Sequence, residues 1–121
     1  MTIMEAIRQV DGLKPNAYSI RQKIQWLSQL EAMVYRLVIQ PREGADGFGG
    51  FTETTDPETC LVMPSPFDMA YLYWLEAQIH YANEDMDLYN RAIVQFNGIY
   101  AQYRADYRRS CKSGNTGRFR F

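Results

Sequence analysis

The sequence predicts a mainly α-helical fold, a small helical bundle, and three observations support this prediction. Apolar residues recur at helical spacing over most of the chain, capping residues stand before the apolar runs, and glycine and proline gather between residues 41 and 66. We therefore expect an N-terminal helix pair, a glycine-rich loop with a short β-hairpin, and a C-terminal antiparallel helical hairpin.

The first helix is predicted to begin after a capping box. Thr2 is followed three places later by Glu5, so each side chain can satisfy a free backbone N–H of the first turn. Asp11 and Gly12 are expected to end this helix. Its apolar face consists of Ile3, Ile7 and Val10.

The second helix is predicted over about residues 20–39. Ser19 followed by Gln22 repeats the capping pattern, and Pro41 is expected to stop the helix because its ring clashes with the preceding turn. The apolar positions recur at helical spacing: Ile20, Ile24, Leu27, Leu30, Val34 and Leu37.

The stretch from 41 to 66 interrupts the helical pattern and is predicted to be a loop and hairpin insertion. P-R-E-G-A-D-G-F-G-G-F is too rich in glycine for a helix, since glycine loses the most backbone freedom on ordering. In F-T-E-T-T-D-P-E-T-C-L-V-M, β-branched residues flank the turn-forming pair Asp56 and Pro57. The second part therefore predicts a short β-hairpin.

The C-terminal hairpin is predicted from helices over about 69–82 and 88–109. Asp68 stands where an N-cap belongs. In the polar break between the helices, Asn83 can adopt the left-handed conformation, and Asp85 or Asp87 can cap the second helix.

Aromatic residues of the last helix follow a heptad step, which favours a packing seam against a partner helix. The alternative is a nucleic-acid stacking platform, but Arg91, Arg104 and Arg108 fall off the aromatic line. The predicted seam consists of Tyr89, Ile93, Phe96, Tyr100, Tyr103 and Tyr107.

Length and charge indicate one helical domain over residues 1–112 and a flexible basic tail over 113–121. The 121 residues carry a net charge of −1, so the chain lacks the basic field of a dedicated nucleic-acid binder. Charge is nevertheless polarised, because the basic residues near the C-terminus are opposed only by Asp106: Arg104, Arg108, Arg109, Lys112, Arg118 and Arg120. Such polarity suggests contacts with neighbours of opposite sign.

No catalytic, cofactor or metal site is predicted. His80 with Glu76 and Glu84 has helical spacing, but no second His or Cys joins them, and G-F-G-G at 47–50 lacks the lysine of a P-loop. Cys60 and Cys111 match no metal spacing and are expected to be reduced intracellular thiols, although a bond between them stays open. The sequence shows neither a secretion signal nor an apolar run of membrane-spanning length.

Three stretches carry a resemblance to a known family. D-G-L-K-P-N-A-Y-S-I-R-Q-K-I-Q-W-L-S-Q-L-E, T-D-P-E-T-C-L-V-M-P-S-P-F-D and Y-L-Y-W-L-E-A-Q-I-H-Y-A-N-E-D-M-D-L-Y-N-R-A-I-V-Q-F-N-G-I-Y resemble small head-tail connector, or adaptor, proteins of tailed phages and prophages of Gram-positive bacteria. The resemblance runs from about residue 4 to 109. It implies a non-enzymatic virion subunit at the head-tail junction, made in the host cytoplasm and arranged as a ring with portal and neighbouring connector or tail-completion proteins.

The contacts of such a ring are expected at the glycine-rich loop and the basic C-terminal end; the plainer alternative is a disordered loop and a frayed end. DNA contact is expected to be incidental, and the alternative function is a cytosolic helical module that binds protein or nucleic acid. The interaction candidates are Gly47, Phe48, Gly49, Gly50, Phe51, Arg104, Arg108, Arg109, Arg118, Phe119, Arg120 and Phe121.

Overall fold

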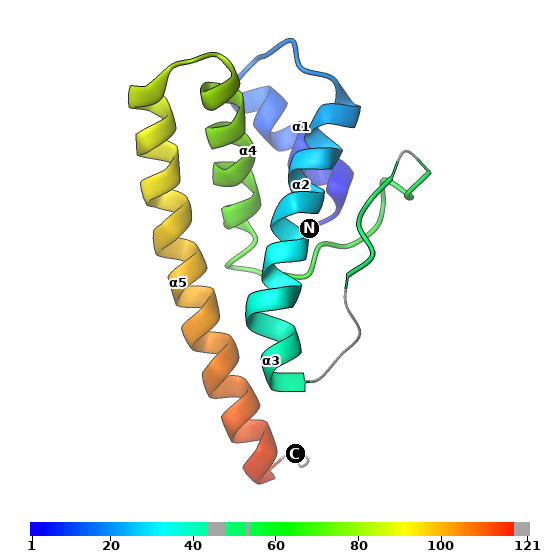
Figure 1. Ribbon diagram of the computed structural model, residues 1–121, viewed down its shortest axis with the longest axis vertical. Coiled ribbons are helices and arrows are strands. Elements are labelled where there is room, and N and C mark those ends of the chain that lie inside the picture. Colours follow the sequence, from blue (N-terminus) through cyan, green and yellow to red (C-terminus); the bar gives the residue numbers. More distant parts are fainter. Residues whose placement is uncertain (44–47, 53, 118–121) are drawn as a thin grey trace.

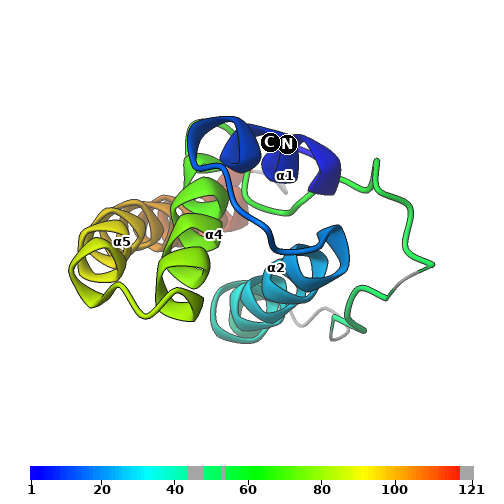
Figure 2. The ribbon, with the colours of Figure 1, turned by 90° about the horizontal axis from the view of Figure 1, so that it is seen from above.

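Helix α4 (Met69–Ala82) lies between the long helix α5 (Met86–Gly117) on one side and the pair α1 (Ile3–Leu13) and α2 (Ile20–Val34) on the other (Figures 1 and 2). A computed structural model describes residues 1–43, 48–52 and 54–117 of the chain. Helix α2 continues into a π-helix, η1 (Tyr35–Ile39), and a last short helix, α3 (Gln40–Glu43). The predicted mainly helical fold is confirmed.

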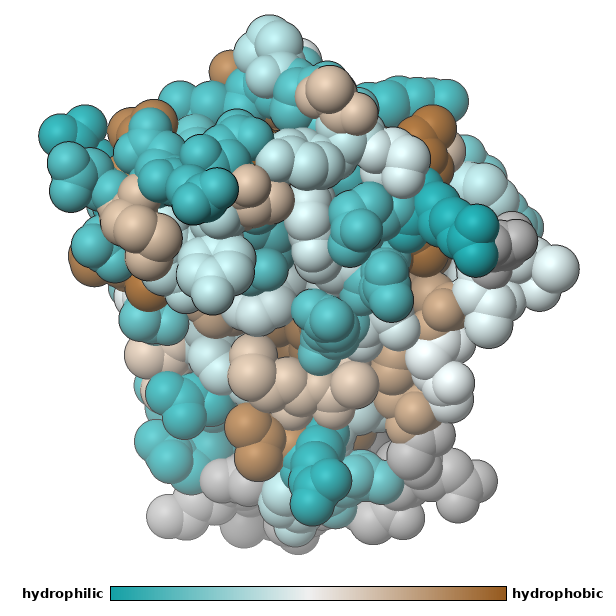
Figure 3. Space-filling model, turned by 45° about the horizontal axis from the view of Figure 1, so that its top comes forward, coloured by the Kyte–Doolittle hydropathy of each residue, from teal (hydrophilic) through white to brown (hydrophobic). Residues whose placement is uncertain are grey.

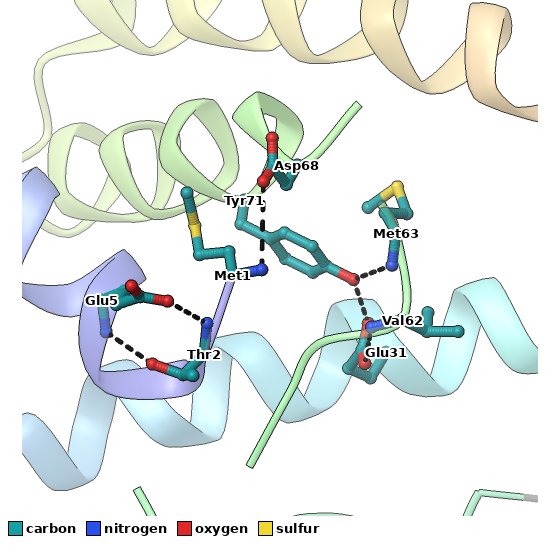
Figure 4. Close-up of polar contacts among 8 residues, drawn as sticks. All are labelled: Met1, Thr2, Glu5, Glu31, Val62, Met63, Asp68 and Tyr71. Atoms are coloured by element: carbon teal, nitrogen blue, oxygen red, sulfur yellow. Dashed lines mark hydrogen bonds and ion pairs between the residues drawn. The ribbon is translucent and has the colours of Figure 1, made fainter. Parts of the chain in front are cut away.

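The capping box of α1 is formed as predicted. The Glu5 amide N–H donates to Thr2 Oγ1 at 3.1 Å, and the Thr2 N–H donates to Glu5 Oε1 at 2.8 Å (Figure 4). The helix ends at Leu13, later than the predicted Asp11 and Gly12, because the Lys14 N–H still donates to the Val10 carbonyl. The apolar face of α1 is fully buried.

The predicted β-hairpin is wrong, since no strand occurs in the described residues between 48 and 68. The backbone of residues 57–61 instead binds the start of the chain. The Ile3 N–H donates to the Thr59 carbonyl and the Leu61 N–H to the Met1 carbonyl, and Thr2 forms an isolated antiparallel bridge with Cys60. The N-terminus thus binds the backbone N–H and carbonyl groups that a second strand of the hairpin would have paired with.

Pro41 does not stop the second helix as predicted but lies within α3. The turn before it is a π-helix, in which the Gln40 N–H donates to the Tyr35 carbonyl five residues back. A wider turn relieves the clash of a proline ring with the turn before it, and the chain continues helically. The extra residue also shifts the helical register, so Val38 is buried (2% exposed) and Leu37, predicted to lie in the apolar row, is 56% exposed.

Asp68 does not cap α4 through its side chain, contrary to the prediction. Its carboxylate lies 3.9 Å from the amino group of Met1, a residue whose side chain is 7% exposed (Figure 4). The positive charge of the N-terminus therefore holds the carboxylate that the local sequence pattern assigns to the helix.

The α4–α5 turn uses Glu84, not Asn83, as its left-handed residue, with φ of 61°. The Asn83 side chain is held elsewhere, because its amide oxygen accepts from the Tyr18 hydroxyl at 2.6 Å. Asp85, one of the two predicted alternatives, caps α5 by accepting from the Leu88 N–H. Helix α5 then runs past the predicted end at Arg109 to Gly117.

The predicted aromatic seam packs into the core at its centre. Phe96, Tyr100 and Tyr103 are 3%, 7% and 2% exposed, while Tyr89, Ile93 and Tyr107 are partly buried. The Phe96 ring meets Trp74 of α4 with centroids 5.2 Å apart, and Tyr103 meets Phe67 at 5.7 Å. Rings buried in this way do not form an open platform for bases.

A buried carboxylate joins α2, α4 and the connecting segment. Glu31, 2% exposed, accepts from the Tyr71 hydroxyl at 2.6 Å and from the Val62 N–H at 2.9 Å. The Tyr71 oxygen in turn accepts from the Met63 N–H at 2.8 Å (Figure 4). Burial raises the pKa of Glu31 above its usual 4.5, although both hydrogen bonds act in the opposite direction.

This pKa shift predicts a pH dependence of stability. A raised folded-state pKa means that the contribution of Glu31 is fully present below pH 4.5 and is lost as pH rises through the raised value. Relative to Glu31→Gln, which cannot ionise, the wild-type free energy of unfolding should fall over that interval and then level off. Urea unfolding of both chains from about pH 4 to 8 tests it. A difference that stays constant with pH contradicts the prediction.

Candidate interaction surface

The phenylalanines of the glycine-rich loop pack on their own chain. The Phe48 ring stacks on Tyr35 of η1 with centroids 5.4 Å apart, and Phe51 meets Phe48 edge-on at 4.9 Å. The Phe51 N–H also donates to Ser28 Oγ of α2 at 3.0 Å. These rings, predicted as interaction candidates, therefore attach the loop to α2 and η1, and both stay partly exposed.

The loop glycines differ in whether their backbone conformation requires a glycine. Gly49 and Gly50 are both exposed, and Gly47 lies outside the described residues. Gly50 has φ of +92°, a conformation that side-chain-bearing residues rarely adopt, whereas an alanine methyl group at Gly49 would have no neighbour within 4 Å. The turn at Gly50 aims the following Phe51 N–H at Ser28.

We expect Gly50→Ala to lower the free energy of unfolding by about 1–2 kcal/mol, because alanine is strained at this φ. Gly49→Ala is the matched control and should change stability by less than about 0.5 kcal/mol. Chemical denaturation of the three chains measures both values. Equal effects at the two glycines would show that the loop backbone does not need the left-handed residue.

Two of the predicted arginines lie together at the lower end of the bundle, which we call the base. There η1 and the C-terminal half of α5 border an open groove of ≈370 Å³, the base groove. Arg104 is fixed by its own helix, since its guanidinium carbon lies 5.0 Å from the centre of the Tyr100 ring. The groove is lined by Leu37, Val38, Ala101, Arg104, Ala105 and Arg108.

The base groove combines exposed positive charge with an exposed apolar side chain. Arg104 and Arg108 are exposed, and neither forms an ion pair with a side chain that the structure describes. Arg109 has a different partner, the carboxylate of Asp106 at 3.5 Å. Leu37 was missed by sequence reasoning, because only the π turn rotates it out of the apolar row.

A second groove, of ≈480 Å³, lies on another side of the base, and no sequence motif pointed to it. Its walls combine η1, the connecting segment and the end of the aromatic seam. The Tyr107 hydroxyl in its wall and the hydroxyl of Tyr100, seven residues earlier on α5, are buried without a hydrogen-bond partner among the described residues. Burial raises the pKa of Tyr100, with Arg104 acting in the opposite direction. The groove is lined by Tyr35, Ile39, Val62, Pro64, Tyr103, Asp106, Tyr107 and Ser110.

The remaining candidates do not come together as a chemical site in the described part of the chain. His80 Nε2 lies 3.7 Å from Glu76 Oε2, but Glu84 sits in the turn beyond α4. The described residues contain no group of three metal-ligating side chains, and none of the described helices has the length and hydropathy to cross a membrane. Cys60 is an exposed free thiol. Arg118, Phe119, Arg120 and Phe121 lie outside the described residues.

The chain was compared with protein-family models, curated proteins and solved structures, and none of them matches it.

Proposed function

We propose that this chain is a non-enzymatic structural subunit of a tailed-phage virion, a head-tail connector or adaptor that assembles as a ring on the portal. It acts by protein-protein contacts at the head-tail junction, after synthesis in the cytoplasm of the bacterial host. The proposal needs no cofactor and no catalytic residue. Its sequence support is the resemblance over residues 4–109, and its structural support is the base groove.

The base groove carries the proposal because its chemistry is that of a protein contact. Arginine is enriched at protein interfaces, where its stem covers apolar surface and its head group pairs with carboxylates. Leu37 is 56% exposed and lines the same groove as the two arginines, so it offers the apolar part of a small interface. Ala101 and Ala105 leave space on α5 for an incoming side chain. These features suit an acidic protein surface with an apolar residue in its middle.

The same arginines give the second candidate function, a cytosolic regulatory module that binds protein or nucleic acid. Arg104 and Arg108 could contact phosphates, and exposed cations on one helix are typical of such binding. The net charge of −1 and the burial of the aromatic seam argue against specific nucleic-acid recognition. In the connector, DNA contact would be weak and incidental.

The experiment has two parts: a search for a portal gene in the neighbourhood of this gene, and co-assembly of the chain with the portal protein that such a gene encodes. We expect the wild type to form ring-shaped complexes with the portal in negative-stain images. Arg104→Ala/Arg108→Ala should weaken the assembly of the ring on the portal and leave the thermal unfolding curve nearly unchanged, because both side chains are exposed. Arg8→Ala, also exposed but on α1, is the control. The absence of a portal gene nearby, together with salt-sensitive nanomolar DNA binding by a persistent monomer, would overturn the proposal in favour of the regulator.

A further inference from the structure

The end of the bundle opposite the base is acidic. We call the α4–α5 turn with its flanking residues the apex, residues 81–87, at the top of Figure 1. Its carboxylates Glu84, Asp85 and Asp87 are exposed, and none forms an ion pair with a described side chain. Two large apolar side chains lie among them, Tyr81 at 59% and Met86 at 47% exposure. The apex thus has the acidic and apolar chemistry that complements the base groove.

The apex and the base groove cannot meet within one chain. Both include residues of α5, and the 21 positions from Asp87 to Arg108 correspond to about 32 Å of helix at 1.5 Å per residue. Helix α4 packs along the upper part of α5 and supports it there (Figure 1). The opposite charges of the two ends therefore cannot pair within one molecule, whereas a second molecule can supply the other end.

We propose that the apex of one copy docks into the base groove of a second copy of this chain. Glu84 and Asp87 would pair with Arg104 and Arg108, and Met86 would lie against Leu37 over the alanines of α5. The contact joins two different faces, so repetition closes a ring or extends a filament according to the rotation between copies. This inference deepens the proposed assembly role and rests on it.

The surface around the apex is mainly hydrophilic on the face that Figure 3 shows. In the view that brings the apex forward, hydrophilic residues dominate the upper surface and hydrophobic residues lie in separate areas (Figure 3). A small contact of a few charge pairs and one apolar pair forms weakly and is screened by salt. We therefore expect self-association that is concentration-dependent in dilute buffer and lost when salt is raised.

Charge reversal at each end tests the contact. The base variant is Arg104→Glu/Arg108→Glu, and the apex variant is Glu84→Lys/Asp87→Lys; Asp85 stays unchanged because it caps α5. Sedimentation equilibrium of the full chain measures self-association. Each variant alone should associate at least about tenfold more weakly than the wild type, because like charges then face each other. Arg8→Glu, with the same type of reversal on α1, should associate like the wild type.

The decisive result is whether self-association returns when the base and apex variants are combined. An equal mixture of the base and apex variants should associate again, and so should one chain carrying all four substitutions, because opposite charges then meet at each contact. A wild type that stays monomeric at every concentration tested, or variants that associate unchanged, overturns the head-to-tail contact. Portal binding is measured separately with the same chains, so retained portal binding without self-association would overturn this inference and leave the connector proposal standing.

Discussion

Replacing Phe96 by alanine is expected to lower the free energy of unfolding by about 3–5 kcal/mol. The ring is 3% exposed and contacts Trp74 of α4 and Tyr100 of its own helix. Its removal leaves a cavity between the two helices whose packing forms the C-terminal half of the bundle. Chemical denaturation followed by circular dichroism measures the loss. Tyr100→Ala, at the next position of the seam, should have a similar effect.

The control for Phe96 is Val94→Ala on the exposed side of α5. Val94 is 65% exposed, so this truncation should cost less than about 0.5 kcal/mol. An unchanged melting transition for Phe96→Ala would show that the aromatic row is not a packing seam. Comparison of the near-ultraviolet circular dichroism of the variant and the wild type would then show whether the aromatic rings are fixed by tertiary packing.

Replacing Glu31 by alanine is expected to lower the free energy of unfolding by about 2–5 kcal/mol. The change leaves the buried Tyr71 hydroxyl and the partly buried Val62 N–H without their acceptor. Relief of the buried charge offsets part of this cost, because burial already disfavours the ionised form. Urea denaturation at about pH 7 measures the balance. Stabilisation instead of destabilisation would mean that the desolvated charge outweighs its hydrogen bonds.

A double-mutant cycle with Tyr71→Phe separates the shared hydrogen bond from the rest of the network. The Glu31→Ala and Tyr71→Phe effects combined in one chain should fall short of their sum, because both variants break the bond between Tyr71 and Glu31. Glu58→Ala, a truncation of an exposed glutamate, should be close to neutral. Strict additivity of the two buried substitutions would contradict the network.

The predicted helices near 3–12, 20–39 and 69–82 are found because each depends on information within one or two turns. Apolar spacing and caps such as Thr2 with Glu5 act over distances that the sequence itself displays. Two predictions failed because a residue distant in the sequence binds a group that had been assigned to local structure. Asp68 was expected to cap α4 but lies near the N-terminal amino group, and residues 57–61 were expected in a hairpin but bind residues 1–4.

The sequence named some of the residues that line the base groove, and their role in binding stays a prediction. The concentration of basic residues near the C-terminus pointed to Arg104 and Arg108, because the distribution of charge along a chain can be taken from the sequence alone. The sequence could not show that Arg109 pairs with Asp106 or that Leu37 joins the two arginines. Nor could it show that the loop rings Phe48 and Phe51, predicted as interaction candidates, pack on Tyr35 and on each other.

The sequence by itself determined the helical class, the capped starts of α1 and α2 and the aromatic seam of α5, because periodicity and capping are local properties of a chain. Only the tertiary structure decided which face Leu37 occupies, since the one-residue π insertion that exposes Leu37 and buries Val38 is not written in the apolar spacing. It also decided that the opposite charges of apex and base stand about 32 Å apart along one helix, where a single molecule cannot join them.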